Sequence, residues 1–425
     1  MDWGFQSHCV CIVDAEGIVL GEKSFPHSGD GLHQLLDWIL DCGVCEADRI
    51  AVAIEGPHGP IVDTVMERGV PVFAIHSKQL DRFRDRFSPA GAKDDRRDAH
   101  VLADAVRTDP QCLRNLDPMD SEVIQLREWS RMSDELTAQR TQLTHQVRTQ
   151  FWRYFPQFLE LKFPLYSAVL HALWTLIPTP SRARRVRLTS VEKVLKRHRI
   201  RRIRAKEVLA ILKTTPLNVA DGVQEAIVAN LRLDQLALIE TQLQEAEHAM
   251  QTLLETMAAA SIPAPAPEDS EPTETASEPI NPESAPGDVN ILESLPGVGT
   301  KVLATLLSEA SGLIKARDYQ GLRAFCGGAP VTRQSRKSRQ VVRRKAGLGR
   351  LSNAIYHWSR VAIQHDPVSK AKYDALRDRG HTHGQALRSV ADRLLAVACA
   401  MLRDQTLYDP SRQSVAVSEI LPEMA

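Results

Sequence analysis

The stretch from residue 259 to residue 288 most constrains how this chain can fold. It contains seven acidic residues and seven prolines, and it has no basic residue. A segment with so few large apolar side chains cannot bury enough surface to offset the conformational entropy that folding costs. We therefore predict a Pro-rich, flexible linker here. The linker divides the 425 residues into two regions, each long enough to build a hydrophobic core.

The region before the linker begins with a pattern of strands and helices. Two β-type runs around the turn at Glu16-Gly17 predict a hairpin, and strand and helix patterns then alternate. This order predicts an α/β domain with a mixed sheet over residues 1–110. The expected strands are 7–13, 18–25, 49–55 and 71–75, and the expected helices are 31–42, 60–68, 80–87 and one that opens near residue 94.

Residues 111–258 are predicted to be helical, with a coiled-coil seam between two long helices. The second helix has two rows of apolar residues at a spacing of seven, and the first helix repeats less regularly. These helices could fold back on each other or pair between subunits. An aromatic-rich segment at 151–158 has helical spacing, which favours a core over a base-stacking surface. The seam residues are Leu236, Leu243, Met250, Met257, Ile239, Ala246 and Leu253 in the second helix and Trp129, Met132, Leu136, Leu143 and Val147 in the first.

Basic charge is concentrated in two tracts although the net charge of the chain is zero. Residues 182–206 hold twelve Lys/Arg and one acid, and residues 333–350 hold eight Lys/Arg and no acid. Clustered cations attract a phosphate backbone whatever the overall sum. We predict that nucleic acid binds Arg182, Arg184, Arg185, Arg201 and Arg202 in the first tract and Arg333, Arg336, Lys337, Arg339, Arg343 and Arg344 in the second.

Acidic residues recur where the elements of the first domain begin and end. Asp2 lies at the start of the first strand, Glu55 at the end of a central strand, and Asp95 and Asp98 on the helix that closes the domain. Residues three apart on a helix share one face, about 5–6 Å apart. Four carboxylates in one place repel one another unless cations compensate, so their convergence would favour a Mg²⁺ or Mn²⁺ site. The alternative is that Asp94 and Asp95 cap the helix and Asp98 pairs with an arginine.

The region after the linker, 289–425, is predicted to be mostly α-helical and holds two further candidates. Ser335 and Ser338 are expected in a loop after Pro330, among the cations of the second tract, where a serine is either a contact to phosphate or a nucleophile that attacks it. The LPGVG turn at 295–299 runs directly into a helical pattern. It is either a helix-hairpin-helix that meets a phosphate with backbone N–H groups or a tight turn before an amphipathic helix.

The cysteine pattern and the hydropathy of the chain indicate in which cellular compartment it is expected. The seven cysteines are odd in number and scattered, which argues against a disulfide framework. Cys42 and Cys45 form a lone CxxC, expected to be buried rather than to bind zinc. No apolar run reaches the length of a membrane helix. We expect a cytoplasmic protein without a membrane partner.

Several short segments, in this order, resemble the transposases of the insertion sequence 110 family, the DEDD-type recombinases. The resemblance covers nearly the whole length. The segments that carry it are Asp2-Trp3-Gly4, IEGPHG with Glu55, AGAKDDRRDAHVLAD with Asp95 and Asp98, LPGVGTKVLATLLSE, and FCGGAPVTRQSRKSR running into RLSNAIYHWSRVA.

The resemblance implies a fold and an activity. It implies a RuvC-like (ribonuclease-H-like) N-terminal domain whose four acids, here Asp2, Glu55, Asp95 and Asp98, bind Mg²⁺ or Mn²⁺. It also implies a C-terminal transposase domain whose serine, five residues after a proline, becomes covalently joined to DNA. That serine is Ser335, with Ser338 in reserve. The implied activity is DNA strand cleavage and exchange through a phosphoserine intermediate.

The same resemblance implies the partners. Family members act on donor and target DNA, and a structured bridge RNA selects both by base pairing. They form dimers that pair into tetramers, in which the acids of one subunit complete the site of another. The protein would be associated with the nucleoid when active.

Two features depart from the family pattern. Arg336 follows Ser335 where the family usually has glycine, which reduces backbone freedom beside the serine. Only Met1 precedes Asp2, so we expect either a start site placed too late or a first ligand weakened by a fraying end.

Two other functions fit the same residues. One is a RuvC-like, metal-dependent junction nuclease that uses water in place of serine. The other is a non-catalytic RNA- or DNA-binding protein from a degenerate element, in which the acids only cap helices.

Overall fold

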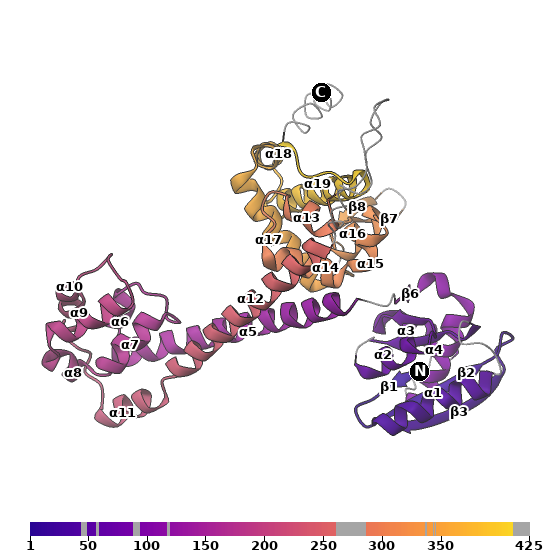
Figure 1. Cartoon of the computed structure of the whole chain (residues 1–425), viewed down its shortest axis with the longest axis horizontal. Helices are drawn as coiled ribbons and strands as arrows, with labels where there is room; N and C mark the ends of the chain where they lie inside the picture. Colours follow the sequence, from indigo (N-terminus) through magenta and orange to yellow (C-terminus); the bar gives the residue numbers. More distant parts are fainter. Residues whose placement is uncertain are drawn as a thin grey trace, which may run out of the picture. The chain divides into compact units, whose positions relative to one another are not determined.

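A computed structural model gives the fold of the chain, which separates into two compact units, Met1–Met119 and Asp120–Ala425. Each unit is described by itself (Figure 1). Side chains of Asp221, Ser338 and Arg339 are not described. The described residues are 1–43, 49–56, 59–87, 94–116, 120–260, 286–335, 338–342, 344 and 346–410.

The first unit contains two three-stranded sheets. In one, an antiparallel meander joins three consecutive strands, and in the other a parallel pair carries a short antiparallel strand at its edge. Every strand predicted from the sequence is present. The strands are β1 (Asp2–Trp3), β2 (Ser7–Val13), β3 (Val19–Pro26), β4 (Val52–Glu55), β5 (Val72–Ile75) and β6 (Arg114–Asn115).

Two hydrogen bonds place β1 of the first sheet beside β4 of the second. The Met1 amino group donates to the Ala53 carbonyl oxygen over 2.9 Å, and the Trp3 indole N–H donates to the Glu55 carbonyl oxygen over 2.6 Å. Because both sets of residue numbers rise together, β1 and β4 run in the same direction.

Helices α1 and α4 both pack against β2, whose successive side chains point to opposite faces of the sheet. Val10 points to the face where α1 buries Leu35 and Leu36, and α4 packs against the same strand as well. The four helices and a 3₁₀ turn are α1 (Gly29–Gly43), α2 (Pro60–Glu67), α3 (Ser77–Arg84), α4 (Asp95–Thr108) and η2 (Pro110–Cys112).

Two long helices, α5 (Ser121–Tyr154) and α12 (Leu233–Ala260), pack along each other in the second unit. Leu136 of α5 contacts Ile239 and Leu243 in the middle of the pair. Nearer the start of α5, Leu126 shares a core with Met250, so the helices run antiparallel. The sequence left open whether these helices fold back on each other, and within one chain they do. Met132, expected in the seam, is 38% exposed.

Between these two helices the chain forms a small helical subdomain with its own core. Phe151, Phe155 and Phe158 are fully buried there, which confirms the prediction that this aromatic segment is core. Trp152 is the exception and is 68% exposed. The helices of the subdomain are α6 (Gln157–Glu160), α7 (Ala168–Leu176), α8 (Pro180–Arg185), α9 (Leu188–Arg197), α10 (Ala205–Leu212) and α11 (Asp221–Asn230).

The described residues of the C-terminal part form helices that pack around Trp358, whose side chain is fully buried and donates to the Pro296 carbonyl oxygen over 2.9 Å. Gly297 in the same turn has a φ of 81°, and a Cβ there would lie 2.7 Å from the backbone nitrogen of Ala362. The elements are α13 (Asp288–Glu293), α14 (Thr300–Glu309), α15 (Ser311–Lys315), α16 (Tyr319–Phe325), β7 (Val331–Ser335), β8 (Ser338–Val342), α17 (Gly349–His365), α18 (Pro367–Asp378) and α19 (His383–Asp404).

One buried carboxylate joins three of these helices. Glu309 at the end of α14 pairs with Arg131 of α5 over 3.0 Å and with Arg350 at the start of α17. Burial by itself raises the pKa of Glu309. The hydrogen bond and charge of Arg131, with the charges of Arg350 and Arg127, outweigh burial and hold that pKa below its ordinary value.

We expect Glu309→Gln to lower the free energy of unfolding of the second unit by about 2 kcal/mol at pH 7, below the range for a fully buried pair because Arg131 is 42% exposed. A carboxyl with a lowered folded pKa stabilises above its unfolded pKa, and that contribution is lost as the pH falls through the folded value. Urea unfolding should therefore show a gap between wild type and variant that closes below pH 4.5. The control is Glu247→Gln, because Glu247 and its partner Lys301 are 52% and 44% exposed. Equal losses in both variants would contradict the prediction.

None of the helices in the described ranges combines the length and the apolar character needed to cross a membrane.

Candidate functional site

The four predicted acids come from three elements that meet in the first unit. Asp2 is in β1, which lies beside β4, and Glu55 is the last residue of β4. Asp95 and Asp98 are in the first turn of α4, which packs against β1, β2 and β4. The elements therefore bring these carboxylates to one region.

The neighbouring Asp94 has a different role. It is the N-cap residue of α4, and its carboxylate accepts a hydrogen bond from the Arg97 backbone N–H over 2.8 Å. Such a bond satisfies one of the free N–H groups at a helix start. The capping alternative thus holds for Asp94.

The electrostatics of Asp2 show which of the other acids act on it. Burial raises the pKa of Asp2 most, and the negative charges of Asp95, Asp98 and Glu55 raise it further, so that it reaches about 6 although the Met1 amino group lowers it. Like charges raise a carboxyl pKa when they lie nearby. A divalent cation beside Asp2 would relieve this repulsion.

The prediction that Asp2 lies at a fraying end is wrong. The side chain of Met1 is in the core, with 3% of the residue exposed, and its amino group is hydrogen-bonded to Ala53. Burial lowers the pKa of that amino group to about 6. Strand pairing with Cys9 fixes Asp2 from the other side.

A residue that the sequence analysis missed, Arg84 of α3, lies against the acids. Its Nε donates to Asp98 over 2.7 Å, and the Asp98 side chain is only 2% exposed. Arg84 also pairs with Asp81 over 2.6 Å. The general alternative, that Asp98 pairs with an arginine, did not identify which arginine, because α3 and α4 meet only in the folded domain.

The residues fit a divalent cation in type and in charge. Carboxylate oxygens are the ligands that Mg²⁺ and Mn²⁺ prefer, and the charges of Asp95, Asp98 and Glu55 all act on Asp2 here. Within the described ranges, no three His, Cys, Asp or Glu side chains are already arranged around one ion position. Arg84 occupies one oxygen of Asp98. A bound cation would share Asp98 with Arg84 or replace it.

The predicted serine lies in the second unit, at the end of a β-hairpin rather than in a loop. Ser335 is exposed and is the last residue of β7, and it pairs with Ser338, the first residue of β8. Ser335 therefore lies at the end of β7 from which the chain continues to β8. Arg336, Lys337 and Arg343 fall outside the described residues, as do Cys45 and most of the predicted linker.

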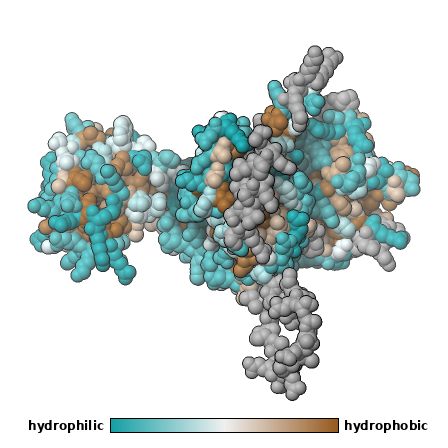
Figure 2. Space-filling view, turned by 90° about the horizontal axis from the view of Figure 1, so that it is seen from above, coloured by the Kyte–Doolittle hydropathy of each residue, from teal (hydrophilic) through white to brown (hydrophobic). Residues whose placement is uncertain are grey.

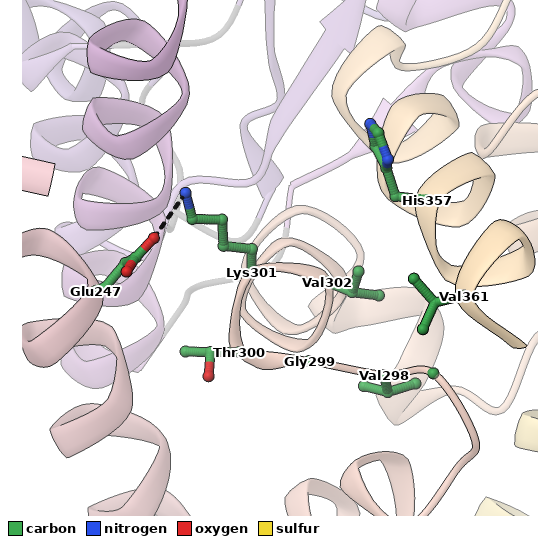
Figure 3. A pocket seen from close by; sticks show the side chains of 9 residues that line it. Glu247, Val298, Gly299, Thr300, Lys301, Val302, His357 and Val361 are labelled. Carbon is green, nitrogen blue, oxygen red and sulfur yellow. Dashed lines mark ion pairs between the residues drawn. The ribbon is translucent and has the colours of Figure 1, made fainter. Parts of the chain in front are cut away.

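The LPGVG turn opens on a hollow of about 490 Å³ between α14, α17 and α12 (Figure 3). Lys301 at the start of α14 pairs across it with Glu247 of α12 over 2.9 Å, and Thr300 donates to Gln251 over 2.9 Å. A carboxylate this close to the helix N-terminus competes with an incoming phosphate. The geometry favours the tight-turn alternative for this segment.

The first basic tract forms an exposed surface of the helical subdomain. Arg182, Arg184 and Arg185 are exposed residues of α8. The face of this subdomain at the left of Figure 2 is hydrophilic around a hydrophobic centre. In the part of the chain that the structure describes, these three guanidinium groups have no acidic partner. Arg202 differs, because it donates to the Lys162 carbonyl oxygen over 2.9 Å and lies over the Phe163 ring.

Comparison with known proteins identifies the family of the chain. Two family models match the chain, one described as a transposase of the DEDD IS110 type over residues 1–156 and one described as the transposase IS116/IS110/IS902 family over residues 289–374. A putative transposase, y4uE, of Sinorhizobium fredii is 52% identical over 206 residues, which is 48% of this chain and 57% of that relative.

Two relatives from Streptomyces coelicolor match over nearly the full length. The mini-circle putative transposase for IS117 is 30% identical over 421 residues, covering 97% of this chain and 95% of the relative. The insertion element IS110 uncharacterized 43.6 kDa protein is 25% identical over 396 residues, covering 91% and 89%. The chain therefore belongs to the IS110 family of transposases.

Proposed function

We propose that the chain is a metal-dependent DNA recombinase that cuts and rejoins strands through a covalent link to Ser335. The observation that carries the proposal is that β1, the end of β4 and the first turn of α4, which hold Asp2, Glu55, Asp95 and Asp98, lie beside one another. The charges of the other three acids add to the raised pKa of Asp2, a cost that a protein that only binds DNA would not need.

The proposed chemistry is a pair of transesterifications. The Ser335 Oγ attacks the scissile phosphorus, a P–O bond to the DNA breaks, and the leaving oxygen becomes a hydroxyl. A hydroxyl of the partner strand then attacks the phosphoserine and releases the serine. Since each step exchanges one phosphoester for another, no nucleotide cofactor is required. A Mg²⁺ or Mn²⁺ ion held by the four acids would stabilise charge on the phosphate.

We further propose that the first unit is RuvC-like. The meander β1–β2–β3, with β4 alongside β1 and parallel to it, supports this assignment. The antiparallel pair of α5 and α12 would be the coiled coil of the family. The proposed boundaries remain 1–110, 111–258, 259–288 and 289–425.

The partners follow from the family. Donor and target DNA, a structured guide RNA and further copies of the chain would assemble into dimers and tetramers. Because the acids and Ser335 belong to separate units, the two parts of the site could come from one chain or from two. Cytoplasmic location and association with the nucleoid are parts of the same proposal.

Variants of the first basic tract test the nucleic-acid surface. We expect Arg184→Gln with Arg185→Gln to weaken binding to duplexes of every sequence to a similar extent, and to reduce the salt slope of binding by about 1 for each phosphate that the variant no longer neutralises. Filter binding over a range of salt measures both effects. Lys315→Gln is the control, because Lys315 is paired with Asp120 over 2.9 Å and is also exposed. If the salt slope of the double variant equals that of wild type, the first basic tract does not contact the nucleic acid.

The two alternatives predict different products. A junction nuclease that uses water leaves free DNA ends and forms no protein–DNA adduct, whereas a recombinase yields joined strands. A non-catalytic binding protein yields neither. Incubation of the protein with donor DNA, target DNA, guide RNA and Mg²⁺, followed by sequencing of the junctions, separates the three.

A further inference from the structure

The hairpin of β7 and β8 has one face that carries Ser335 and one that does not. The register pairs Arg333 with Gln340 and Ser335 with Ser338. Side chains two apart on a strand share a face, so Arg333 and Gln340 lie on the face of Ser335. Gln334, between Arg333 and Ser335, belongs to the opposite face.

Neither face of the hairpin is covered by the described part of the chain. Arg333, Gln334 and Gln340 are exposed, and Val341 is 64% exposed. A two-stranded ribbon without a covering layer is marginally stable alone. The hairpin lies at the margin of the C-terminal helices (Figure 1).

The base of the hairpin, in contrast, is held closely to the body. The Leu348 backbone N–H donates to the Phe325 carbonyl oxygen over 2.9 Å. A Cβ at Gly347 would lie 2.9 Å from the backbone nitrogen of Gly327, so the two chain segments touch there. The ribbon is thus anchored at its base and projects its polar residues outward.

We propose that this ribbon enters the major groove of the DNA duplex beside the cleavage site, and that Arg333 and Gln340 read base edges there. Charge favours DNA as the occupant, since residues 333–350 contain eight Lys/Arg and no acid. The major groove admits a two-stranded ribbon. Gln pairs with the N6 and N7 of adenine, and Arg pairs with the O6 and N7 of guanine. The inference rests on the proposed role of Ser335, which fixes the face that meets DNA.

Strand geometry sets which base pairs are read. A strand rises about 3.3 Å per residue, so the pair of Arg333 and Gln340 lies about 7 Å from the pair of Ser335 and Ser338 along the ribbon. Base pairs in B-DNA are about 3.4 Å apart along the axis. The reading residues therefore fall about two base pairs from the scissile phosphate. Any base preference of the protein itself should be centred there.

The matched pair Gln340→Ala and Gln334→Ala tests the inference. The probe is a set of DNA duplexes randomised within four base pairs of the cleavage site, with the guide RNA adjusted to stay complementary. The measured quantity is the rate at which covalent protein–DNA complex forms on each sequence. Gln340→Ala should reduce discrimination between bases by about 5- to 150-fold at a position about two base pairs from the scissile phosphate. Gln334→Ala, on the other face, should leave it unchanged.

The outcomes separate this inference from the proposed function. If Gln340→Ala and Gln334→Ala lose base discrimination equally, or if neither loses it, the face of Ser335 does not read bases. A wild-type protein that forms the covalent complex equally fast on every sequence also overturns the inference. Failure of the wild type to form any covalent complex instead refutes the proposed role of Ser335. Both substitutions are at exposed positions, so circular dichroism should confirm that the variants fold.

Discussion

Asp95→Asn is expected to lower DNA cleavage by about 10³-fold or more, because it removes one charged ligand from the proposed cation site. Asp95 is exposed at the start of α4, so the variant should fold normally. Asp98→Asn should lose as much activity. Its effect on folding will be larger, since it also ends the pair with Arg84. The measurement is the cleavage rate at saturating Mg²⁺ on DNA that wild type cuts.

The adjacent acid gives a matched control for Asp95. Asp94→Asn changes the same charge one residue away, and asparagine caps helices as well as aspartate does. Cleavage by Asp94→Asn should stay within about a few-fold of wild type. A second measurement does not depend on activity: Mg²⁺ should raise the melting temperature of wild type but not that of Asp95→Asn. If Asp95→Asn and Asp98→Asn keep full activity, the acids only cap and pair, and the non-catalytic alternative stands.

Ser335→Ala is expected to abolish the covalent protein–DNA complex, a loss of at least about 10⁴-fold when a nucleophile is removed. Binding of DNA should be unchanged, because a single exposed hydroxyl contributes little to the contact with phosphate. The measurement is the yield of adduct on a suicide substrate whose second strand cannot be rejoined.

Ser338→Ala is the matched control for that experiment, since Ser338 pairs with Ser335 across the hairpin. It should keep most of the adduct. An adduct that persists in Ser335→Ala but vanishes in Ser338→Ala would move the nucleophile to the second strand of the hairpin.

The elements of the first unit were predictable because their signals are local. Apolar runs and turn residues predicted β2, β3, β4 and β5 within a few residues of their observed bounds, and Asp94 before an apolar helix is a cap signal. The sequence also placed the four acids near the ends of elements that pack together in the structure. Arg84 was not predictable, since its contact with Asp98 depends on how α3 packs on α4.

The hairpin that carries Ser335 was expected to be a loop for a physical reason. The sequence between its strands, Arg336-Lys337, lacks the Asn-Gly or Asp-Gly residues that mark a two-residue hairpin connection. The strand sequences, VTRQS and SRQVV, show no regular alternation of apolar and polar residues. The structure forms it nonetheless, anchored by the close approach of Gly327 and Gly347.

The pairing of α5 with α12 could be predicted from the sequence only in part. The heptad rows predicted apolar faces correctly, for Leu236, Leu243 and Met250 are buried. Such rows do not say which surface will cover them. In the structure the helical subdomain between the two helices brings the chain back, and α12 packs antiparallel on α5.

The most direct test of the central claim is to identify the residue that is joined to DNA. Wild-type protein is trapped on a suicide DNA substrate with guide RNA and Mg²⁺, digested with a protease and a nuclease, and the nucleotide-bearing peptide is sequenced by mass spectrometry. The account predicts a phosphodiester on Ser335, formed only when divalent metal is present. Cleaved DNA without any nucleotide-bearing peptide, or a nucleotide on a residue outside the β7–β8 hairpin, would contradict it.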